Sequence, residues 1–339
     1  ISACLVGSEM CIRDRAMADW ASWKKTVDYT VKTQGRWYGI GDADGTPLFT
    51  LPMPSEPDTP DQWMDSADLQ VTFPAREPDG SVSRAAELLV MDALDKFDPS
   101  GRLPTAEGDY MLLAAFPGAG GQVVRRGGAI VHTTANDEDN DGVPSEITIH
   151  ALNCMDVWHT IPAVSWPAAW WKADPYEVGS DESGIEYKKK RLMARVELAT
   201  NAMFVWKNGP AAFVIRRLAQ ESLDAAMRTQ ADPDGVKWVD DPYHVVEVPE
   251  EDTSEEISLE ARDGFLWETV SKQAENAGVI LGAYIWWPGD KPVRCWSQAT
   301  SSMSPRDVDI TPSEGKSSRA LGYRTFEHAM IVLTVKEVA

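Results

Sequence analysis

The chain has 339 residues, 43% of them apolar and 25% charged, a composition typical of globular domains and long enough for about two of them. Its net charge of −21 repels phosphate, so we expect no specific binding to nucleic acid and no tight binding to DNA or anionic lipid. This charge is compatible with an acidic wall past which DNA slides without binding, and equally with a charge that serves only solubility. No stretch approaches the roughly 18 apolar residues that span a bilayer, so we expect no membrane segment.

The first sixteen residues are predicted not to belong to the fold. Residues 1–15 read ISACLVGSEMCIRDR, and Met17 follows almost at once. The run CLVGSEMCIRD resembles a translated sequencing adapter, and its apolar residues fit neither helical nor strand periodicity. We therefore treat residues 1–16 as an artefactual leader, with a weakly structured natural tail as the alternative. Without them two of the four cysteines disappear, and the net charge is unchanged because two acids and two bases are lost.

The first half of the chain is predicted to be rich in strands. Val27, Tyr29 and Val31 alternate, which indicates a half-buried strand within residues 20–39. Proline-rich residues 52–60 predict a loop, and apolar residues at helical spacing predict a helix over 82–97. Further strands are expected at residues 48–51, after a turn at 42–45, and at residues 69–73 and 110–116.

The clearest local signal is a hairpin between residues 129–134 and 147–152, two segments dominated by β-branched residues. His132 and His150 fall on its opposite arms and are candidates for cross-strand neighbours, with a polar pair on the solvated face favoured over a metal-binding pair. Its acidic tip places Asp137, Asp139 and Asp141 at alternate positions, as in the first half of a calcium-binding loop. Threonine stands where such a loop needs its last carboxylate ligand. A solvated tip is therefore favoured over a calcium site.

The second half is predicted to mix helices and strands, which makes the fold class α+β. We place the domain boundary near Gly179, giving a β-rich domain over residues 17–179 and a mixed domain over 180–339. Helices are expected over 192–206, opened by the basic run 188–191, then over 215–227, and over 265–277 with Asp263 as its cap. Strands are expected at 245–248 and 324–335, with a hairpin of 279–286 and 293–297. The chain ends just after a strand-like run with no tail, and truncation at the C-terminus is one expectation.

No residues point to catalysis, so we expect neither an enzyme nor a cofactor. The five histidines lack metal-ligand spacing, and there is no nucleophile elbow and no phosphate-binding glycine loop. Cys154 and Cys295 are expected to be buried free thiols. Tryptophan is abundant, with 14 residues. Five of them are candidates for packing in the core or at a subunit interface, or for stacking on sugars: Trp166, Trp170, Trp171, Trp286 and Trp287.

The order of several segments resembles the minor tail protein or baseplate-hub family of long-tailed phages that infect actinobacteria. The resemblance covers residue 17 to about residue 297 and depends on order rather than on any single motif. The segments are LQVTF at 69–73, the Gly127-Gly128 strand leading to EITIHALNCMDVW, WPAAW at 166–170, AAFVIRRLAQESLD at 211–224, FLWETVSKQAENAGV at 265–279 and IWWPGDKPVR at 285–294.

The resemblance implies a β-rich hub at the tail tip that assembles as a homo-oligomer, usually a trimer, around the path of the exiting genome. It implies docking to the tail tube, distal tail and tape-measure proteins, a place in the virion, and assembly in the host cytoplasm. The alternative from another class is a carbohydrate- or receptor-binding module that uses exposed tryptophans. A peptidoglycan hydrolase is a weaker third reading, because no converging carboxylates or metal triad can be assigned.

Overall fold

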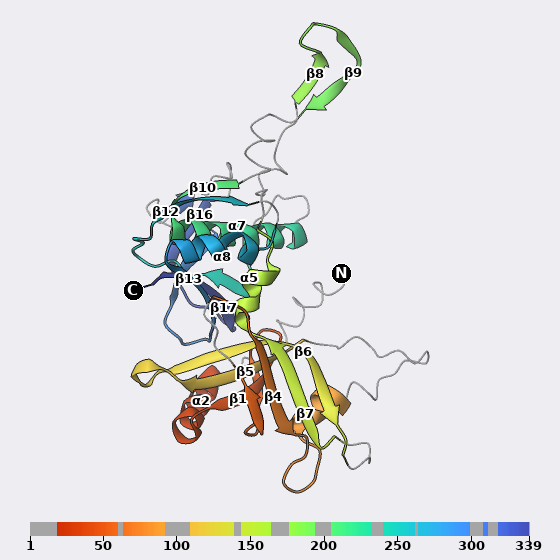
Figure 1. Cartoon of the computed structure of the whole chain (residues 1–339), viewed down its shortest axis with the longest axis vertical. Coiled ribbons are helices and arrows are strands. Elements are labelled where there is room, and N and C mark those ends of the chain that lie inside the picture. Colours follow the sequence, from red (N-terminus) through yellow and green to blue (C-terminus); the bar gives the residue numbers. More distant parts are fainter. Residues whose placement is uncertain are drawn as a thin grey trace.

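The computed structural model describes residues 19–59, 64–91, 109–138, 144–163, 176–193, 205–231, 240–261, 264–298, 308–310 and 318–338. The fold is α+β, as expected. Figure 1 shows a large sheet at one end of an elongated molecule, helices and smaller sheets in its middle, and a separate two-stranded hairpin at the other end.

One antiparallel sheet of seven strands dominates the first half, with the strand order β2-β1-β5-β6-β7-β4-β3. Neighbours along the chain pair as hairpins, namely β1 with β2, β3 with β4, β5 with β6, and β6 with β7. The expected strands at 69–73 and 110–116 and the expected hairpin after residue 129 are confirmed. The strand bounds are β1 Trp37–Asp42, β2 Pro47–Thr50, β3 Glu56–Asp58, β4 Asp68–Pro74, β5 Tyr110–Pro117, β6 Val123–Asn136 and β7 Glu146–Leu152.

The prediction of a strand over residues 20–39 is wrong in its first part, because Trp20–Gln34 forms the helix α2. Val27 and Val31 are buried whereas Tyr29 between them is exposed, so the buried positions are spaced by four and not by two. Asp19 begins the helix by accepting a hydrogen bond from the Ser22 backbone N–H, at 3.1 Å. Gly35 ends it in the left-handed region, with φ of +80°. Only then does the chain extend into β1.

The sheet has its own core on one face. Fourteen buried side chains form it, among them Tyr38, Phe73 and Ile149, and the aromatic rings of Tyr38 and Phe73 meet edge-on at 6.0 Å. The expected helix over 82–97 is short in the described part. It consists of α3, Arg84–Ala86, and one π-helical turn, Glu87–Met91, and the rest of that prediction lies outside the described residues.

The second half contains three long-range sheets of two or three strands, with the orders β10-β12, β11-β17-β13 and β14-β16-β15. The strand bounds are β10 Val205–Pro210, β11 His244–Val246, β12 Glu256–Ala261, β13 Val279–Trp286, β14 Val293–Gln298, β15 Val308–Ile310, β16 Ser318–Arg324 and β17 Met330–Glu337. The helices are α5 Val157–Thr160, α7 Ala211–Ala231 and α8 Leu266–Asn276.

The second predicted hairpin is wrong in its pairing, although both of its strands exist. β13 pairs with β17 over eight residue pairs, and β14 pairs with β16 in another sheet. β17 lies between β11 and β13, and its Val332 and Leu333 are completely buried in two different core clusters. Burial of this apolar strand on both sides outweighs the local tendency of the Trp287–Asp290 turn to pair its flanking strands.

The helix predictions of the second half have mixed outcomes. The strand β9, Glu186–Met193, holds the basic run 188–191, so these residues do not open a helix, and residues 194–204 lie outside the described part. The prediction over 215–227 is confirmed by α7, and that over 265–277 by α8. Phe265 and not Asp263 is the N-cap of α8, where the Glu268 carboxylate accepts a hydrogen bond from the Phe265 backbone N–H at 3.3 Å.

The two halves share buried side chains. Val27, Val31 and Trp37 pack with Ile285, Trp287 and Ala329 in one cluster. Trp158, which follows the last strand of the large sheet, belongs to the core of the second half, and its indole N–H donates to the Gly282 carbonyl at 3.1 Å. The predicted boundary near Gly179 falls inside the strand β8, Tyr176–Ser180, and stays a prediction. Among the described residues, no helix is both long and apolar enough to cross a bilayer.

Candidate functional site: a projecting hairpin and a junction pocket

The strands β8 and β9 form an antiparallel hairpin that we call the arm, residues 176–193. Its turn is held by Asp181, whose carboxylate accepts hydrogen bonds from the Ser183 backbone N–H and hydroxyl and from the Ile185 backbone N–H. These bonds hold the pKa of Asp181 below its ordinary value, the Ser183 hydroxyl contributing most. Figure 1 shows the arm standing apart from both the large sheet and the small sheets.

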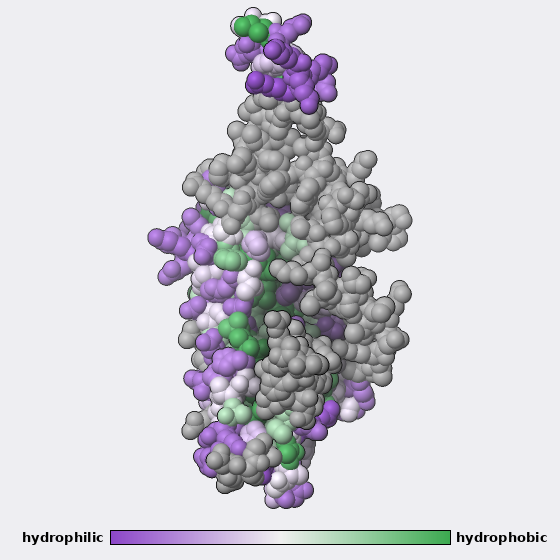
Figure 2. Space-filling view, turned by 90° about the vertical axis from the view of Figure 1, so that its right-hand side faces the viewer, coloured by the Kyte–Doolittle hydropathy of each residue, from purple (hydrophilic) through white to green (hydrophobic). Residues whose placement is uncertain are grey.

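The arm presents one apolar side chain and a basic row to solvent. Ile185, at the turn, is 65% exposed. Lys188, Lys189, Lys190 and Arg191 follow on β9 and are exposed. Four acids and four bases occur within residues 176–193, so the arm has a net charge of 0 in a chain of net charge −21. The hydrophilic surface of this end of the molecule is visible in Figure 2.

A second candidate site lies where the two halves meet. The residue that organises it is Asp290, in the turn after β13. Its carboxylate pairs with Lys24 of α2 at 2.6 Å and with Arg125 of β6, and it accepts the Trp287 backbone N–H at 2.8 Å. One carboxylate of the second half therefore binds two cations of the first half. Both cations and the carboxylate are mostly buried, which strengthens their attraction relative to an exposed pair.

The side chain of Trp287 packs at the centre of this junction. Its ring centroid lies 5.7 Å from that of Trp20 and 6.3 Å from that of Trp37, and the Arg125 guanidinium carbon lies 4.5 Å from it. Aromatic edges and a guanidinium over the ring face are the arrangements that the ring quadrupole favours. These contacts fix the Arg125 side chain beside Asp290.

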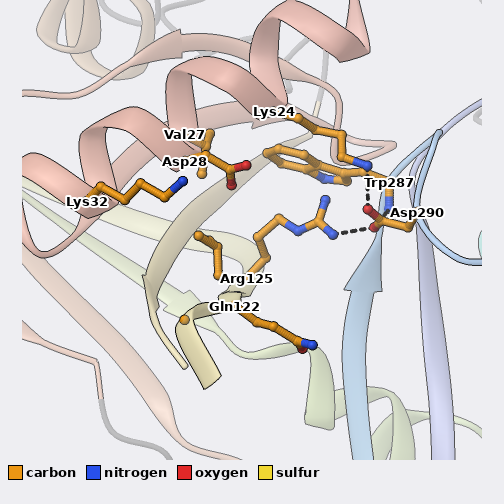
Figure 3. Close-up of a pocket in the computed structure, with 10 residues that line it drawn as sticks. Lys24, Val27, Asp28, Lys32, Gln122, Arg125, Trp287 and Asp290 are labelled. Carbon is orange, nitrogen blue, oxygen red and sulfur yellow. Dashed lines mark hydrogen bonds and ion pairs between the residues drawn. The ribbon is translucent and has the colours of Figure 1, made fainter. Parts of the chain in front are cut away.

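A pocket of about 250 Å³ opens beside these residues, which we call the junction pocket. Figure 3 shows Lys32 and Asp28 of α2 on one side of it and Arg125 on the other. Val27, Val123 and Gln122 complete much of its lining. Two buried donors of the lining have no hydrogen-bond partner among the described residues, the Nη1 of Arg125 and the Nε1 of Trp287. The pocket therefore combines positive charge with unused donors.

The structure describes two of the five candidate tryptophans, and the side chains of both are buried. Trp286 and Trp287 are each 1% exposed. Neither is an exposed platform for sugars or for a partner subunit, which corrects that part of the prediction and agrees with core packing. Trp286 and Trp287 belong to two different core clusters, and the Asp290 carboxylate accepts a hydrogen bond from the Trp287 backbone N–H in the turn that follows. Trp166, Trp170 and Trp171 lie outside the described residues.

The predicted histidine pair is confirmed. His132 and His150 are register partners on β6 and β7, with ring centroids 4.2 Å apart and ring planes at 12°. Only Asp137 of the three calcium candidates is described, since Asp139 and Asp141 lie outside, and the calcium site stays a prediction. In the part of the chain that is described, no three histidines, cysteines or carboxylates gather as a metal site would require. Cys154 and Cys295 are buried and unbridged.

Sequence reasoning did not identify the junction pocket. Its residues come from positions 24–32, 121–125 and 287–290, which no local pattern connects. One signal was available, because Trp20, Trp23, Val27 and Val31 are spaced as one face of a helix, which would have placed Lys24, Asp28 and Lys32 on a neighbouring face. That the helix packs on residues 287–290 has no sequence signature.

Comparison with models of known protein families gives no match, and comparison with curated proteins gives none either.

Proposed function

We propose that the chain is a structural subunit of the tail tip of a long-tailed phage. It acts by assembling with copies of itself, as a trimer, and by docking to the tail tube, distal tail and tape-measure proteins around the path of the exiting DNA. The order of segments described above supports the family. The observation in the structure that carries the proposal is the projecting arm.

An isolated two-stranded hairpin is marginally stable in water, because it buries little apolar surface. The arm nevertheless has a bonded turn, an ion pair between Lys190 and Glu177 at 3.2 Å, and the Arg191 guanidinium 4.2 Å from the Tyr187 ring. Such a hairpin gains stability when its exposed strands and Ile185 are covered by another chain. We assign a second copy of this protein to that role.

Charge supports self-association through the arm. Two copies with net charge −21 repel each other, and contact is easiest where this excess charge is missing. The arm carries no excess, and its row of Lys188 to Arg191 offers cations to an acidic neighbour. An assembly in which each arm reaches the acidic body of the next subunit would place positive against negative surface. The remaining acidic surface would let DNA pass without binding it.

The experiment is the mass of the full chain in solution, measured by light scattering across a range of concentrations. We expect an oligomer near three times the 37.4 kDa of one chain. The variant Ile185→Asp places a charge at the exposed apolar position of the arm and should shift the mass toward one chain.

Val131→Asp is the matched control, because Val131 of β6 is exposed to a similar extent, 59%, but lies on the large sheet. It should leave the mass unchanged. A chain that stays monomeric at every concentration overturns the proposal. So does equal dissociation by the two variants, since the arm would then have no special role.

A further inference from the structure

We propose that the junction pocket binds an oxyanion, a carboxylate or a phosphate group, which joins α2 of the first half to the turn after β13 of the second half. The inference concerns one chain and does not depend on whether the chain assembles. Arg125, Trp287 and Lys32 are its binding residues.

The unused donors of the pocket are the first argument. Arg125 gives part of its guanidinium to Asp290, but its Nη1 is buried without an acceptor, and so is the Nε1 of Trp287. A buried donor without a partner costs free energy, more when it is charged. An acceptor in the pocket would remove that cost. Water molecules would accept hydrogen bonds from these donors but would not balance charge.

The charge of the pocket is the second argument. Its lining contains three cations, Lys24, Lys32 and Arg125, and two carboxylates, Asp28 and Asp290, so one positive charge is in excess. Asp290 is shared by Lys24 and Arg125. Lys32 has no ion pair among the described residues and points toward the pocket in Figure 3. A local positive excess inside a chain of net charge −21 is the reverse of its surroundings.

The geometry of these donors defines the ligand. A guanidinium presents flat, parallel N–H groups that match the two oxygens of a carboxylate or of a phosphate. The pocket, at about 250 Å³, is larger than one oxyanion group, and Val27 and Val123 give it apolar walls. It therefore fits an oxyanion attached to a short apolar stem, whether that is a free small molecule or the end of an acidic side chain.

The test is a titration of the full chain with sodium phosphate and, separately, with sodium acetate, followed by the thermal unfolding midpoint. Sodium chloride at matched ionic strength is required, because salt alone relieves repulsion within an acidic protein. We expect at least one of the two oxyanions to raise the midpoint beyond the chloride series. Acetate alone would assign a carboxylate ligand, phosphate alone a phosphate ligand, and both a site for either group.

Two variants locate the binding. Lys32→Gln removes the unpaired cation and should weaken the fitted affinity by about threefold, as expected for a partly exposed charge. Arg125→Lys keeps the positive charge beside Asp290 but removes the planar guanidinium with its parallel N–H groups. It should weaken the fitted affinity by more than about tenfold. Lys25→Gln is the matched control, since Lys25 is exposed on the same helix but does not line the pocket.

The proposal is overturned if neither oxyanion shifts the midpoint beyond chloride. It is also overturned if Lys25→Gln weakens binding as much as Lys32→Gln, because the effect would then belong to the whole charge of the helix. If Arg125→Lys lowers the midpoint without ligand, the fitted affinity still decides, since it is measured relative to each variant's own baseline.

Discussion

The large sheet and the small sheets of the second half are built from strands of similar length but pair them differently. Four of the six neighbouring pairs in the large sheet are hairpins between strands that follow each other in the chain. In the second half β11 pairs with β17, which is far from it in the sequence. β13 and β14 likewise pair with strands that come after residue 317. Early pairing in the first region needs only short loops to close, whereas the second region needs most of its chain.

This contrast teaches that the two regions owe their order to different causes. Turn chemistry and alternation account for the four hairpins of the first, whereas its β1–β5 and β4–β7 pairs join strands far apart in the chain. Competition for burial arranges the second, in which β17 receives neighbours on both edges. The junction cluster around Trp37 and Trp287 connects the regions, so we expect them to unfold as one unit despite their different construction.

The largest effect is expected from removing one large side chain from each core. Phe73→Ala in the large sheet and Trp158→Ala in the second half should each lower the free energy of unfolding by about 3–5 kcal/mol, since both side chains are fully buried. Urea unfolding followed by circular dichroism and by fluorescence measures this. We expect one common transition in both variants. Two separate transitions in either variant would show that the junction does not couple the regions.

A smaller effect is expected from adding one methyl group to a strand glycine of each region. A Cβ on Gly128 of β6 would lie 1.3 Å from the Leu152 carbonyl oxygen, so Gly128→Ala must move backbone and should cost about 3 kcal/mol. A Cβ on Gly322 of β16 meets no atom within 4 Å. Gly322→Ala should therefore change stability by less than about 0.5 kcal/mol. Similar melting midpoints for the two variants would contradict the close approach of β6 to the end of β7.

An effect smaller than that of Gly128→Ala concerns Asp241, which precedes β11. Burial favours a raised pKa for this carboxyl, but the His244 ring and the backbone N–H groups of Tyr243 and His244 outweigh it and hold its pKa below the ordinary value. The ionised form is therefore stabilised in the folded chain. Its contribution is complete above the unfolded pKa near 3.9 and is lost as the pH falls through the folded pKa.

Asp241→Asn should cost about 1–2 kcal/mol at pH 7, and this difference from the natural chain should shrink below about pH 4. Urea unfolding at a series of pH values measures it. Asp68→Asn is the control in the other region, because Asp68 is exposed at the start of β4. A difference that stays constant down to pH 2.5 would mean that the Asp241 charge is not involved.

The sequence correctly predicts several elements whose signal lies within one short segment. β4, β5 and the β6–β7 hairpin follow from alternation and β-branched residues, and the stacking of His132 on His150 follows from their positions on opposite arms. The helices α7 and α8 follow from apolar stripes. The helix α2 escapes this reasoning because Val27, Tyr29 and Val31 alternate, while Val27 and Val31 fit the helical period equally well; Trp20 and Trp23 are the residues that favour the helix.

The sequence by itself determined the fold class, most elements of the large sheet and the apolar stripes of α7 and α8. Only the tertiary structure decided which strands of the second half are neighbours, that Trp286 and Trp287 are buried, and that Lys24, Lys32 and Arg125 surround one pocket. The physical reason is that alternation and helical spacing are properties of a few consecutive residues. The pairing of distant strands and the lining of pockets depend instead on which distant apolar surfaces bury each other. That burial is determined by the fold of the whole chain.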